Sequence, residues 1–301
     1  MRDPAIDAEG LRRRAALLSA VRRWFAEHGY LEVPTPIVVP SPALEAELYA
    51  YPAAGGALRT SPELALKRVL AAGLPRIVEI GPCFRAREHG PWHRAEFTMC
   101  EWYRAGATLA DLQREVRAIV EVARQAVGAP DPGPWRRVTV RQLVLEVTGI
   151  DLATASARDL SGHADEDWDT AFFRRWVEDV EPTLTTPTFV EAWPASQAAL
   201  ATVRTDGAMP VAERFEVFLG GVELANAFQE LRDPGVLRSR WEHANAVRAG
   251  RGDEPHPIDE AFLSAVSVMP RSAGIALGMD RLLAALLGWK GIAAGRVDIG
   301  A

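Results

Sequence analysis

Apolar residues recur near the 3.6-residue period of an α-helix over residues 8–29, with Leu11, Leu18 and Val21 among them. Positions with this spacing lie on one side of a helix, so the pattern predicts an amphipathic helix that packs against a core. Gly29 is suited to end that helix. Residues 30–37 then read as an extended segment, because two prolines occur there and a residue before proline avoids the helical region.

The helical period returns further along the chain. In the first of these segments Ser61 is placed to cap a helix and Pro62 to occupy its first position. Glu63 would then lie in the first turn, where the helix dipole favours a carboxylate. The pattern predicts helices over residues 60–72, 108–127, 139–148, 235–250 and 257–267.

A period of two predicts an antiparallel strand pair between the first two of these helices. An apolar run at 77–84 leads into a polar loop with glycine and proline at 89–94, and the chain returns through 96–103. Side chains of a strand alternate between its two faces. Glu101 and Tyr103 therefore share one face, and Cys100 and its even-numbered neighbours share the other.

The first of these faces is an unusual one for a core. It carries an aromatic ring at Phe97, a carboxylate at Glu101 and a phenol at Tyr103, and Arg85 follows the partner strand. Such a set favours a pocket for a cationic, phosphate-bearing ligand.

Residues 188–193 read as a buried strand, and Gly220-Gly221 after them is a strong signal for a two-residue hairpin turn. Regular pairing across this turn sets Glu216 opposite Ala225, so Glu216 and Glu223 fall on the same face. Two adjacent carboxylates repel one another unless a cation lies between them. Mg²⁺ binds through one or two carboxylates and substrate phosphates, so the pair is a candidate magnesium site.

Glu230 follows Glu223 by seven residues, an odd separation that places it on the opposite face of a regular strand. If Glu230 belongs to the same site, the strand must bulge or end near Asn226-Ala227, and we expect such an irregularity. The competing interpretation is a solvated strand edge that carries three unrelated acids.

The last predicted element begins as a strand of small residues at 272–278 and turns at Gly278 into a helix that starts near Asp280. Glycine permits a flat ligand to approach the backbone closely. Arg281, at the start of that helix, adds a fork of donors that suits phosphate.

Composition narrows the class of protein without identifying it. The chain has 301 residues, 48% of them apolar and 25% charged, as expected of a globular protein with a sizeable core. The net charge of −6 argues against a large nucleic-acid interface. The two cysteines, Cys83 and Cys100, are too few for a disulfide framework and are interpreted as core residues. No signal peptide or membrane helix is predicted, which favours the cytoplasm.

The segment FRAREHGPWHRAEFTMCEWYR, Phe84–Arg104, resembles motif 2 of class II aminoacyl-tRNA synthetases, most closely the lysyl-tRNA-synthetase-like ligases that modify elongation factor P. The Glu-x-Tyr pair at its end marks the lysine-binding branch of that family. The helix at 8–29 with its extended Thr-Pro continuation resembles motif 1, which forms the dimer interface in the family. Gly-x-Asp-Arg at 278–281 resembles motif 3.

The resemblance implies roles for individual residues. Arg85 would contact the substrate carboxylate and the α-phosphate of ATP, and Phe97 would stack on adenine. Glu63 would accept the α-ammonium. Glu216 and Glu223 would hold Mg²⁺. The implied amino-acid pocket consists of Ser61, Pro62, Glu63, Glu101, Tyr103 and Glu230. The implied nucleotide site consists of Arg85, Arg87, Glu88, His93, Arg94, Phe97, Glu223, Leu224, Gly278 and Arg281, with Arg85 and Arg281 as the catalytic pair.

The chain also departs from the family pattern. The usual glutamate two places after the motif 2 arginine is Arg87 here, and a glutamate follows one place later as Glu88. Arg94 stands where close relatives commonly have asparagine, and Ala227 where many have glycine. These changes concern the edge of the adenine site more than the lysine pocket.

The resemblance implies an α+β fold in one domain, a class II synthetase catalytic core with an antiparallel sheet flanked by helices and an insertion at about 128–187. It implies a homodimer that uses ATP and Mg²⁺. The first helix begins near residue 8, so a core without the anticodon-reading domain is expected, with no role for tRNA.

The implied reaction is activation of lysine or β-lysine as an adenylate and its transfer to elongation factor P. Three alternatives remain open: another acceptor, a non-catalytic paralogue that senses an amino acid, and ordinary tRNA charging.

Overall fold

A computed structural model describes residues 7–161 and 166–297 of the chain, which form two compact units. The first comprises the described residues up to Asp131 and those from Glu230 onward, and the second is Pro132–Gln229. The predicted insertion at 128–187 falls almost entirely in the second unit, and residues 162–165 of it lie outside the described part. The single domain expected from the sequence stays a prediction.

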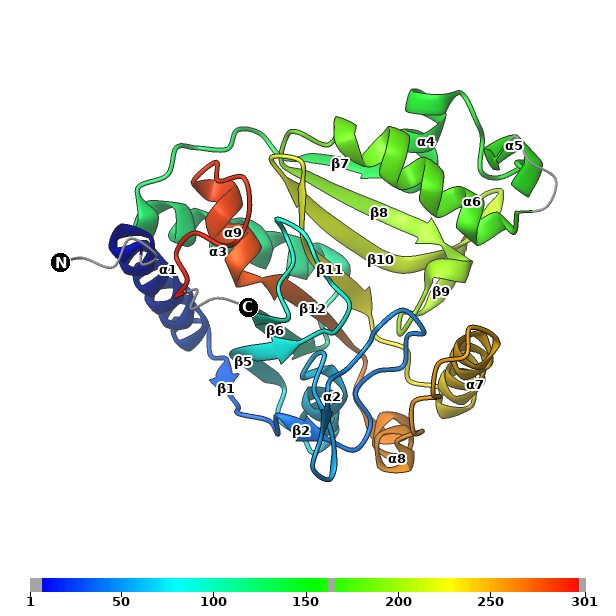
Figure 1. The fold of residues 1–301 in the computed structure, drawn as a ribbon, viewed down its shortest axis with the longest axis horizontal. Helices are drawn as coiled ribbons and strands as arrows, with labels where there is room; N and C mark the ends of the chain where they lie inside the picture. Colours follow the sequence, from blue (N-terminus) through cyan, green and yellow to red (C-terminus); the bar gives the residue numbers. More distant parts are fainter. Residues whose placement is uncertain (1–6, 162–165, 298–301) are drawn as a thin grey trace. The chain divides into compact units, whose positions relative to one another are not determined.

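In the first unit, helices lie on both faces of a sheet (Figure 1). The strand order is β1-β5-β6-β12, and a small separate sheet has the order β2-β4-β3. The strands are β1 (Leu31–Glu32), β2 (Val38–Val39), β3 (Pro52–Ala53), β4 (Gly56–Leu58), β5 (Arg76–Phe84), β6 (Glu96–Ala105) and β12 (Ser272–Gly278). The helices are α1 (Ala8–Glu27), α2 (Glu63–Ala71), α3 (Leu109–Val127), α7 (Pro234–Gly250), α8 (Glu260–Val268) and α9 (Met279–Leu286).

The second unit is built on the strand order β11-β10-β8-β7, with β9 paired to β10. Its strands are β7 (Arg136–Thr139), β8 (Thr188–Pro194), β9 (Val203–Asp206), β10 (Met209–Leu219) and β11 (Val222–Gln229). Its helices are α4 (Val140–Thr148), α5 (Ala157–Ser161) and α6 (Trp168–Arg175), with a π-helical turn at Trp176–Val180 and 3₁₀ turns at Glu181–Thr183 and Ala195–Gln197.

The α+β class expected from the sequence is confirmed, and most strand pairs are antiparallel as expected. β1 pairs with β5, and β7 with β8, in the parallel sense, so the strand arrangement is mixed. Parallel neighbours require a connection that crosses over, and the stretch with β2, β3, β4 and α2 supplies one between β1 and β5. Within the described residues, no helix is long and apolar enough to cross a membrane.

Most of the predicted helices begin and end within a few residues of their expected limits. Capping residues account for several of these helix starts. Thr108, for example, caps α3 in a reciprocal capping box with Asp111. α2 begins one residue later than expected. Pro62 is its N-cap, and the Ser61 hydroxyl still accepts the backbone N–H of Glu63 at 3.0 Å.

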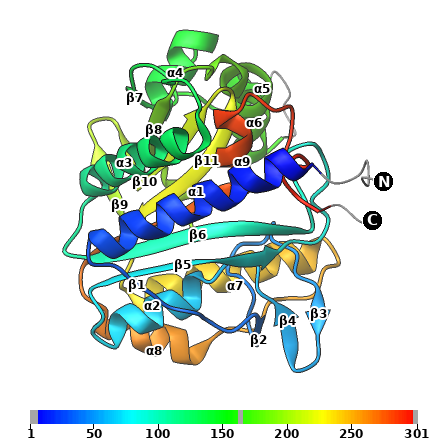
Figure 2. The ribbon, with the colours of Figure 1, turned by 90° about the vertical axis from the view of Figure 1, so that its left-hand side faces the viewer.

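The alternation predicted along β6 sorts its two faces as expected. The even-numbered side chains face α1 and α3, where Trp102 is fully buried and Thr98 contacts Arg14 of α1. The odd-numbered side chains face α2, where Glu101 and Tyr103 lie. Figure 2 shows α1 and α3 on one side of β5 and β6, with α2 and α8 on the other.

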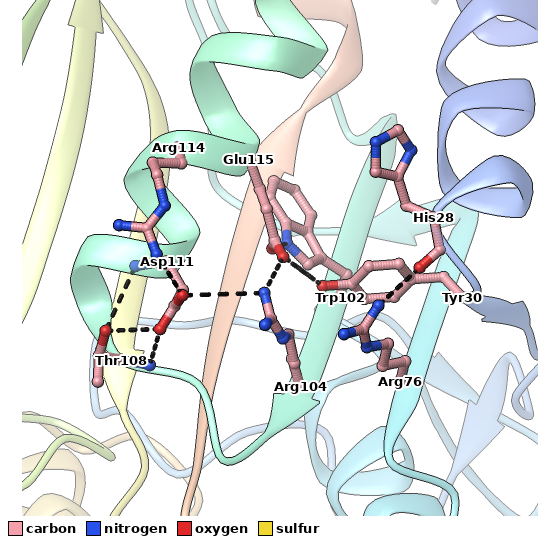
Figure 3. Close-up of polar contacts among 9 residues, drawn as sticks. All are labelled: His28, Tyr30, Arg76, Trp102, Arg104, Thr108, Asp111, Arg114 and Glu115. Atoms are coloured by element: carbon pink, nitrogen blue, oxygen red, sulfur yellow. Dashed lines mark hydrogen bonds and ion pairs between the residues drawn. The ribbon is translucent and has the colours of Figure 1, made fainter.

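A buried carboxylate fastens β6 to the helical layer (Figure 3). Glu115 of α3 accepts hydrogen bonds from Tyr30 Oη and Trp102 Nε1, both at 2.9 Å, and from Arg104 Nη1 at 2.8 Å. Burial and the neighbouring carboxylate raise the pKa of Tyr30, so its phenol stays a donor. The contacts join the segment after α1, the strand β6 and the helix α3 at one point.

We expect Glu115→Ala to lower the free energy of unfolding by about 3 kcal/mol, because it leaves two buried donors unpaired and removes the partner of Arg104. Urea unfolding measures this. Glu121→Ala on the same helix is the control, since Glu121 is half-exposed and its partners Arg124 and Gln125 lie one turn away on the same helix. A loss below about 1 kcal/mol for Glu115→Ala would contradict the assignment.

The hairpin of β10 and β11 contains the irregularity that the sequence required, but at a different place. Glu216 pairs with Asn226, not with Ala225, and the register slips between Val217 and Phe218. Leu224 has no partner in that register, so it is the bulged residue. The slip shifts every later residue of β11 by one place in the pairing. It therefore removes the odd separation that would place Glu223 and Glu230 on opposite faces of a regular strand.

Candidate active site

Glu101 of β6 lies at the centre of a buried polar cluster in the first unit. Its side chain is 1% exposed, and its two oxygens accept hydrogen bonds from Ser61 Oγ at 2.5 Å and Tyr103 Oη at 3.1 Å. Burial, assisted by the charge of Glu63, raises the pKa of Glu101 from 4.5 to about 8. The hydroxyls come from two separate elements, so Glu101 is held from both sides.

A second acidic residue of this cluster is Glu230, which directly follows β11. It is 2% exposed, and its backbone N–H donates to Ser272 O at 3.0 Å, which ties it to β12. Lys67 Nζ lies 2.6 Å from Glu230 Oε2 and 2.6 Å from Glu63 Oε1. The other oxygen of Glu230, Oε1, is buried and has no hydrogen-bond partner among the described residues. Burial raises the pKa of Glu230 to about 7, although Lys67 opposes the shift.

Gly274 of β12 makes room for this cluster. It pairs with Tyr103 across the β6–β12 ladder. A methyl carbon added at Gly274 would lie 2.2 Å from Cε1 of Tyr103 and 2.6 Å from Oε1 of Glu230. The absence of a side chain at this position therefore lets the phenol and the carboxylate meet.

Two pocket residues were missed by sequence reasoning. Lys67 is one, and its signal was available, because Lys67 and Lys290 are the only lysines among 34 basic residues of the sequence. Glu45 is the other, and it precedes β3 in a stretch without periodicity. Burial and the charge of Glu63 raise the pKa of Glu45, while Arg85 and Lys67 lower it.

The raised pKa values predict how stability depends on pH. Glu101 and Glu230 hold a proton more tightly in the folded protein than in the unfolded chain, where the ordinary value is 4.5. The free energy of unfolding should therefore fall as pH rises from 4.5 to about 8 and level off above that. Thermal unfolding of the free protein measures this. Glu101→Gln should flatten the slope, and parallel curves for the two proteins would contradict the shift.

Arg85, the residue after β5, lies near the same cluster. Its Nε donates to Thr60 O at 3.4 Å, its Nη1 lies 3.5 Å from Glu88 Oε1, and its guanidinium lies 5.2 Å from the ring centre of Phe97. The cation that lies over Phe97 is thus Arg85. Arg281 lies next to the motif 2 loop, where its Nη2 lies 2.8 Å from His93 Nε2 and its Nε donates to Trp92 O.

Arg87, the residue that departs from the family pattern, is held away from Arg85. Its guanidinium lies 3.9 Å from the ring centre of Tyr49, and its Nη1 bonds Asp253 Oδ1 at 3.0 Å. Tyr49 Oη donates to the other oxygen of Asp253 at 2.7 Å. Arg87 has φ +64°, a left-handed conformation that is uncommon for a residue with a side chain. These contacts fix the start of the motif 2 loop. Arg94 donates to the carbonyls of Gly90 and His93 within the same loop.

Asp280 joins the three segments with family resemblance. Its carboxylate accepts hydrogen bonds from Arg14 of α1, from the backbone N–H of Thr98 of β6 at 2.7 Å and from Arg296 at 3.1 Å. Gly278 ends β12 opposite Met99 and precedes α9 directly. The start of α9, and with it Arg281, is therefore set by α1 and β6.

The candidate magnesium ligands lie in the second unit. Glu216 is buried and bonded to Arg214, which also donates to Asn226 Oδ1 at 2.9 Å. Burial raises the pKa of Glu216 to about 8, Arg214 opposes this, and Glu223 adds to it. The two carboxylates therefore repel one another on one strand face, as the sequence predicted, and this donor set suits a hard cation. No cluster of three or more potential metal ligands occurs in residues 7–161 and 166–297.

Comparisons with known proteins give a family match and two close relatives. A family model described as tRNA synthetases class II (D, K and N) matches residues 3–294. Two curated relatives are each 38% identical to this chain, and both are named "Elongation factor P--(R)-beta-lysine ligase". One, from Proteus mirabilis (strain HI4320), aligns over 304 residues, and the other, from Photorhabdus laumondii subsp. laumondii, over 309. Each alignment covers 95% of this chain and 93% of the relative.

Proposed function

The chain belongs to the class II tRNA synthetase family of the D, K and N type, and on that premise we propose that it is an ATP-dependent ligase. It activates lysine or (R)-β-lysine as an adenylate and transfers the acyl group to a lysine side chain of elongation factor P. The acceptor is proposed from the names of the two relatives. Ligases of this class use ATP.

The observation that carries the proposal is the buried oxygen of Glu230 that has no hydrogen-bond partner among the described residues, beside Glu101 and Tyr103. A buried carboxylate oxygen without a donor is costly, so the site fits a ligand that brings one. The side-chain ammonium of a lysine-like amino acid does this, and Tyr103 supports it as a neutral phenol. A neutral side chain would leave the acids unpaired, which discriminates strongly against it.

The first step forms an acyl-phosphate bond and breaks the bond between the α- and β-phosphates. An oxygen of the amino-acid carboxylate attacks the α-phosphorus, and pyrophosphate leaves. Arg85 lies where its guanidinium would offset the charge that develops on the α-phosphate. In the second step a lysine amine of the acceptor attacks the acyl carbon, AMP leaves, and the amine loses its proton.

The remaining site residues divide between the two substrates. Ser61 and Pro62 line the amino-acid end, and Glu63 accepts the α-ammonium. Phe97 stacks on adenine, and Arg281 with His93 binds the phosphate tail. Further nucleotide contacts are proposed for Arg87, Glu88, Arg94, Leu224 and Gly278. Glu216 and Glu223 would hold Mg²⁺, which neutralises charge on the triphosphate when it is bound.

We also propose a cytoplasmic homodimer that acts without tRNA. The segment after α1 supports the dimer, because Leu31, Ile37 and Val38 are apolar yet 52%, 42% and 43% exposed. The net charge of −6 supports the absence of an extended RNA contact.

The test has two stages. Exchange of labelled pyrophosphate into ATP is measured with α-lysine and both β-lysine enantiomers, and the accepted amino acid is then incubated with ATP and elongation factor P. The expected result is lysine-dependent exchange and a gain of one lysyl residue in the intact mass of elongation factor P. Exchange without a mass gain would overturn the acceptor, and no exchange with any amino acid would overturn the ligase.

A further inference from the structure

Lys67 occupies a place in the pocket that the proposed reaction does not explain. It lies one helical turn after Glu63 on α2, and its side chain is 1% exposed. Its ammonium lies 2.6 Å from one oxygen of Glu63 and 2.6 Å from one oxygen of Glu230, and 5.9 Å from the ring centre of Tyr103. A buried lysine with two carboxylates at this distance is an internal cation shared between two elements.

The choice of lysine is informative in this chain. Apart from Lys67 and Lys290, every basic residue among the 34 is arginine. Arginine presents a planar fork that matches a single carboxylate, whereas an ammonium is a compact charge whose three donors point in different directions. Bridging Glu63 of α2 and Glu230 beyond β11 needs the second geometry. Lys67 therefore replaces the usual arginine at a position that requires a compact charge.

The groups around Lys67 are mostly acidic. The groups that influence the charge of Lys67 or of its partners lie on α2 and β6, in the segment before β3, and directly after β5 and β11. They are Glu45, Glu63, Glu101, Tyr103, Glu230 and Arg85. Carboxylates gathered in this way favour protonation, which would leave fewer negative charges for a cationic ligand.

Glu230 divides its two oxygens. Oε2 faces Lys67, and Oε1 has no hydrogen-bond partner in the described part of the chain. Oε1 lies on the side of Gly274, beside the ring of Tyr103, and a β-carbon at Gly274 would come within 2.6 Å of it. A ligand ammonium at Oε1 would therefore add to Lys67 without displacing it.

We propose that Lys67 is a positioning residue, a fixed cation that favours the ionised form of Glu230 and holds the Glu63 and Glu230 carboxylates in place, so that Glu230 Oε1 receives the side-chain ammonium of the amino acid. The inference rests on the proposed function. It makes Lys67 the group that sets the pH range in which a lysine-like amino acid binds, without touching that amino acid's reacting atoms.

The experiment is a calorimetric titration of the full chain with lysine and with (R)-β-lysine, without ATP, between about pH 6 and about pH 9. Lys67→Gln keeps donors for both carboxylates but removes the charge. Lys290→Gln is the matched control, since Lys290 is exposed. Near neutral pH we expect Lys67→Gln to bind about 30-fold more weakly, because an adjacent cation lowers a carboxyl pKa by roughly one to three units. The deficit should shrink toward the upper end of the range, where the carboxylates ionise unaided. Lys290→Gln should match the wild type.

Three results would overturn the proposal. These are a deficit that does not change with pH, affinity equal to wild type, and tighter binding, which would make Lys67 a competitor of the ligand. If Lys67→Gln does not fold, Lys67→Met, which fills nearly the same volume without a charge, replaces it, with the same pH-dependent deficit expected and the same results contradicting it. A wild type that binds neither amino acid would overturn the proposed function, whereas lysine binding with no effect of Lys67 overturns this inference alone.

Discussion

Arg85→Ala is expected to lower the rate of lysine-dependent pyrophosphate exchange about a thousandfold, the upper end of the loss seen when one preorganised donor to a developing charge is removed. Arg85 lies between Glu88 and the ring of Phe97, so the guanidinium is held in place before substrates bind. If it acts mainly on the transition state, the loss falls on kcat more than on KM. Steady-state exchange at saturating lysine measures it.

Arg12→Ala is the matched control for this prediction. Arg12 is 76% exposed and pairs with Glu9 on the surface of α1, so its loss should leave exchange unchanged. A reduction for Arg85→Ala of less than about tenfold would contradict the role given to Arg85. A similar reduction in both variants would point to a general effect of lost positive charge.

Gly274→Ala is expected to raise the dissociation constant for lysine about a hundredfold. The added methyl group collides with the ring of Tyr103 and with Glu230 Oε1, so one of these groups must retreat from the pocket. Overpacking of this kind typically costs 1–3 kcal/mol, and here the cost falls on the ligand site. The dissociation constant for lysine, measured by calorimetry, checks the prediction.

Gly250→Ala serves as the control for Gly274→Ala. Gly250 ends α7, a methyl group there would meet nothing within 4 Å, and its φ lies outside the left-handed region. It should bind lysine as the wild type does. Unchanged lysine affinity in Gly274→Ala would show that Tyr103 and Glu230 do not jointly form the ammonium site.

Much of this architecture could be predicted from local pattern. The two faces of β6 follow from alternation, which does not depend on what packs against the strand. The hairpin turn at Gly220-Gly221 was likewise readable, because the turn chemistry is local. The three motifs were recognised by their resemblance to those of the family.

Other features depend on contacts between distant segments. The bulge had to exist if Glu230 joined the site, but its place at Leu224 is decided by how β10 and β11 pair near their turn. Nothing in the sequence around Arg87 indicates that it packs on Tyr49 and Asp253, since these lie 38 and 166 positions away. The parallel pairing of β1 with β5 is also non-local.

Lys67 has one contact that local pattern could predict and one that it could not. Its rarity in an arginine-rich chain was visible, and its place one turn after Glu63 follows from helix geometry. Its second partner, Glu230, lies 163 positions further along and could not be assigned without the fold.

The most direct measurement compares lysine with norleucine, whose side chain has the same four carbons but lacks the terminal ammonium, in the exchange assay. A pocket built from Glu101, Tyr103 and Glu230 predicts kcat/KM for lysine at least about a thousandfold higher, because norleucine leaves buried acids without a partner. Comparable values for the two amino acids would contradict the central claim that these residues hold a side-chain ammonium.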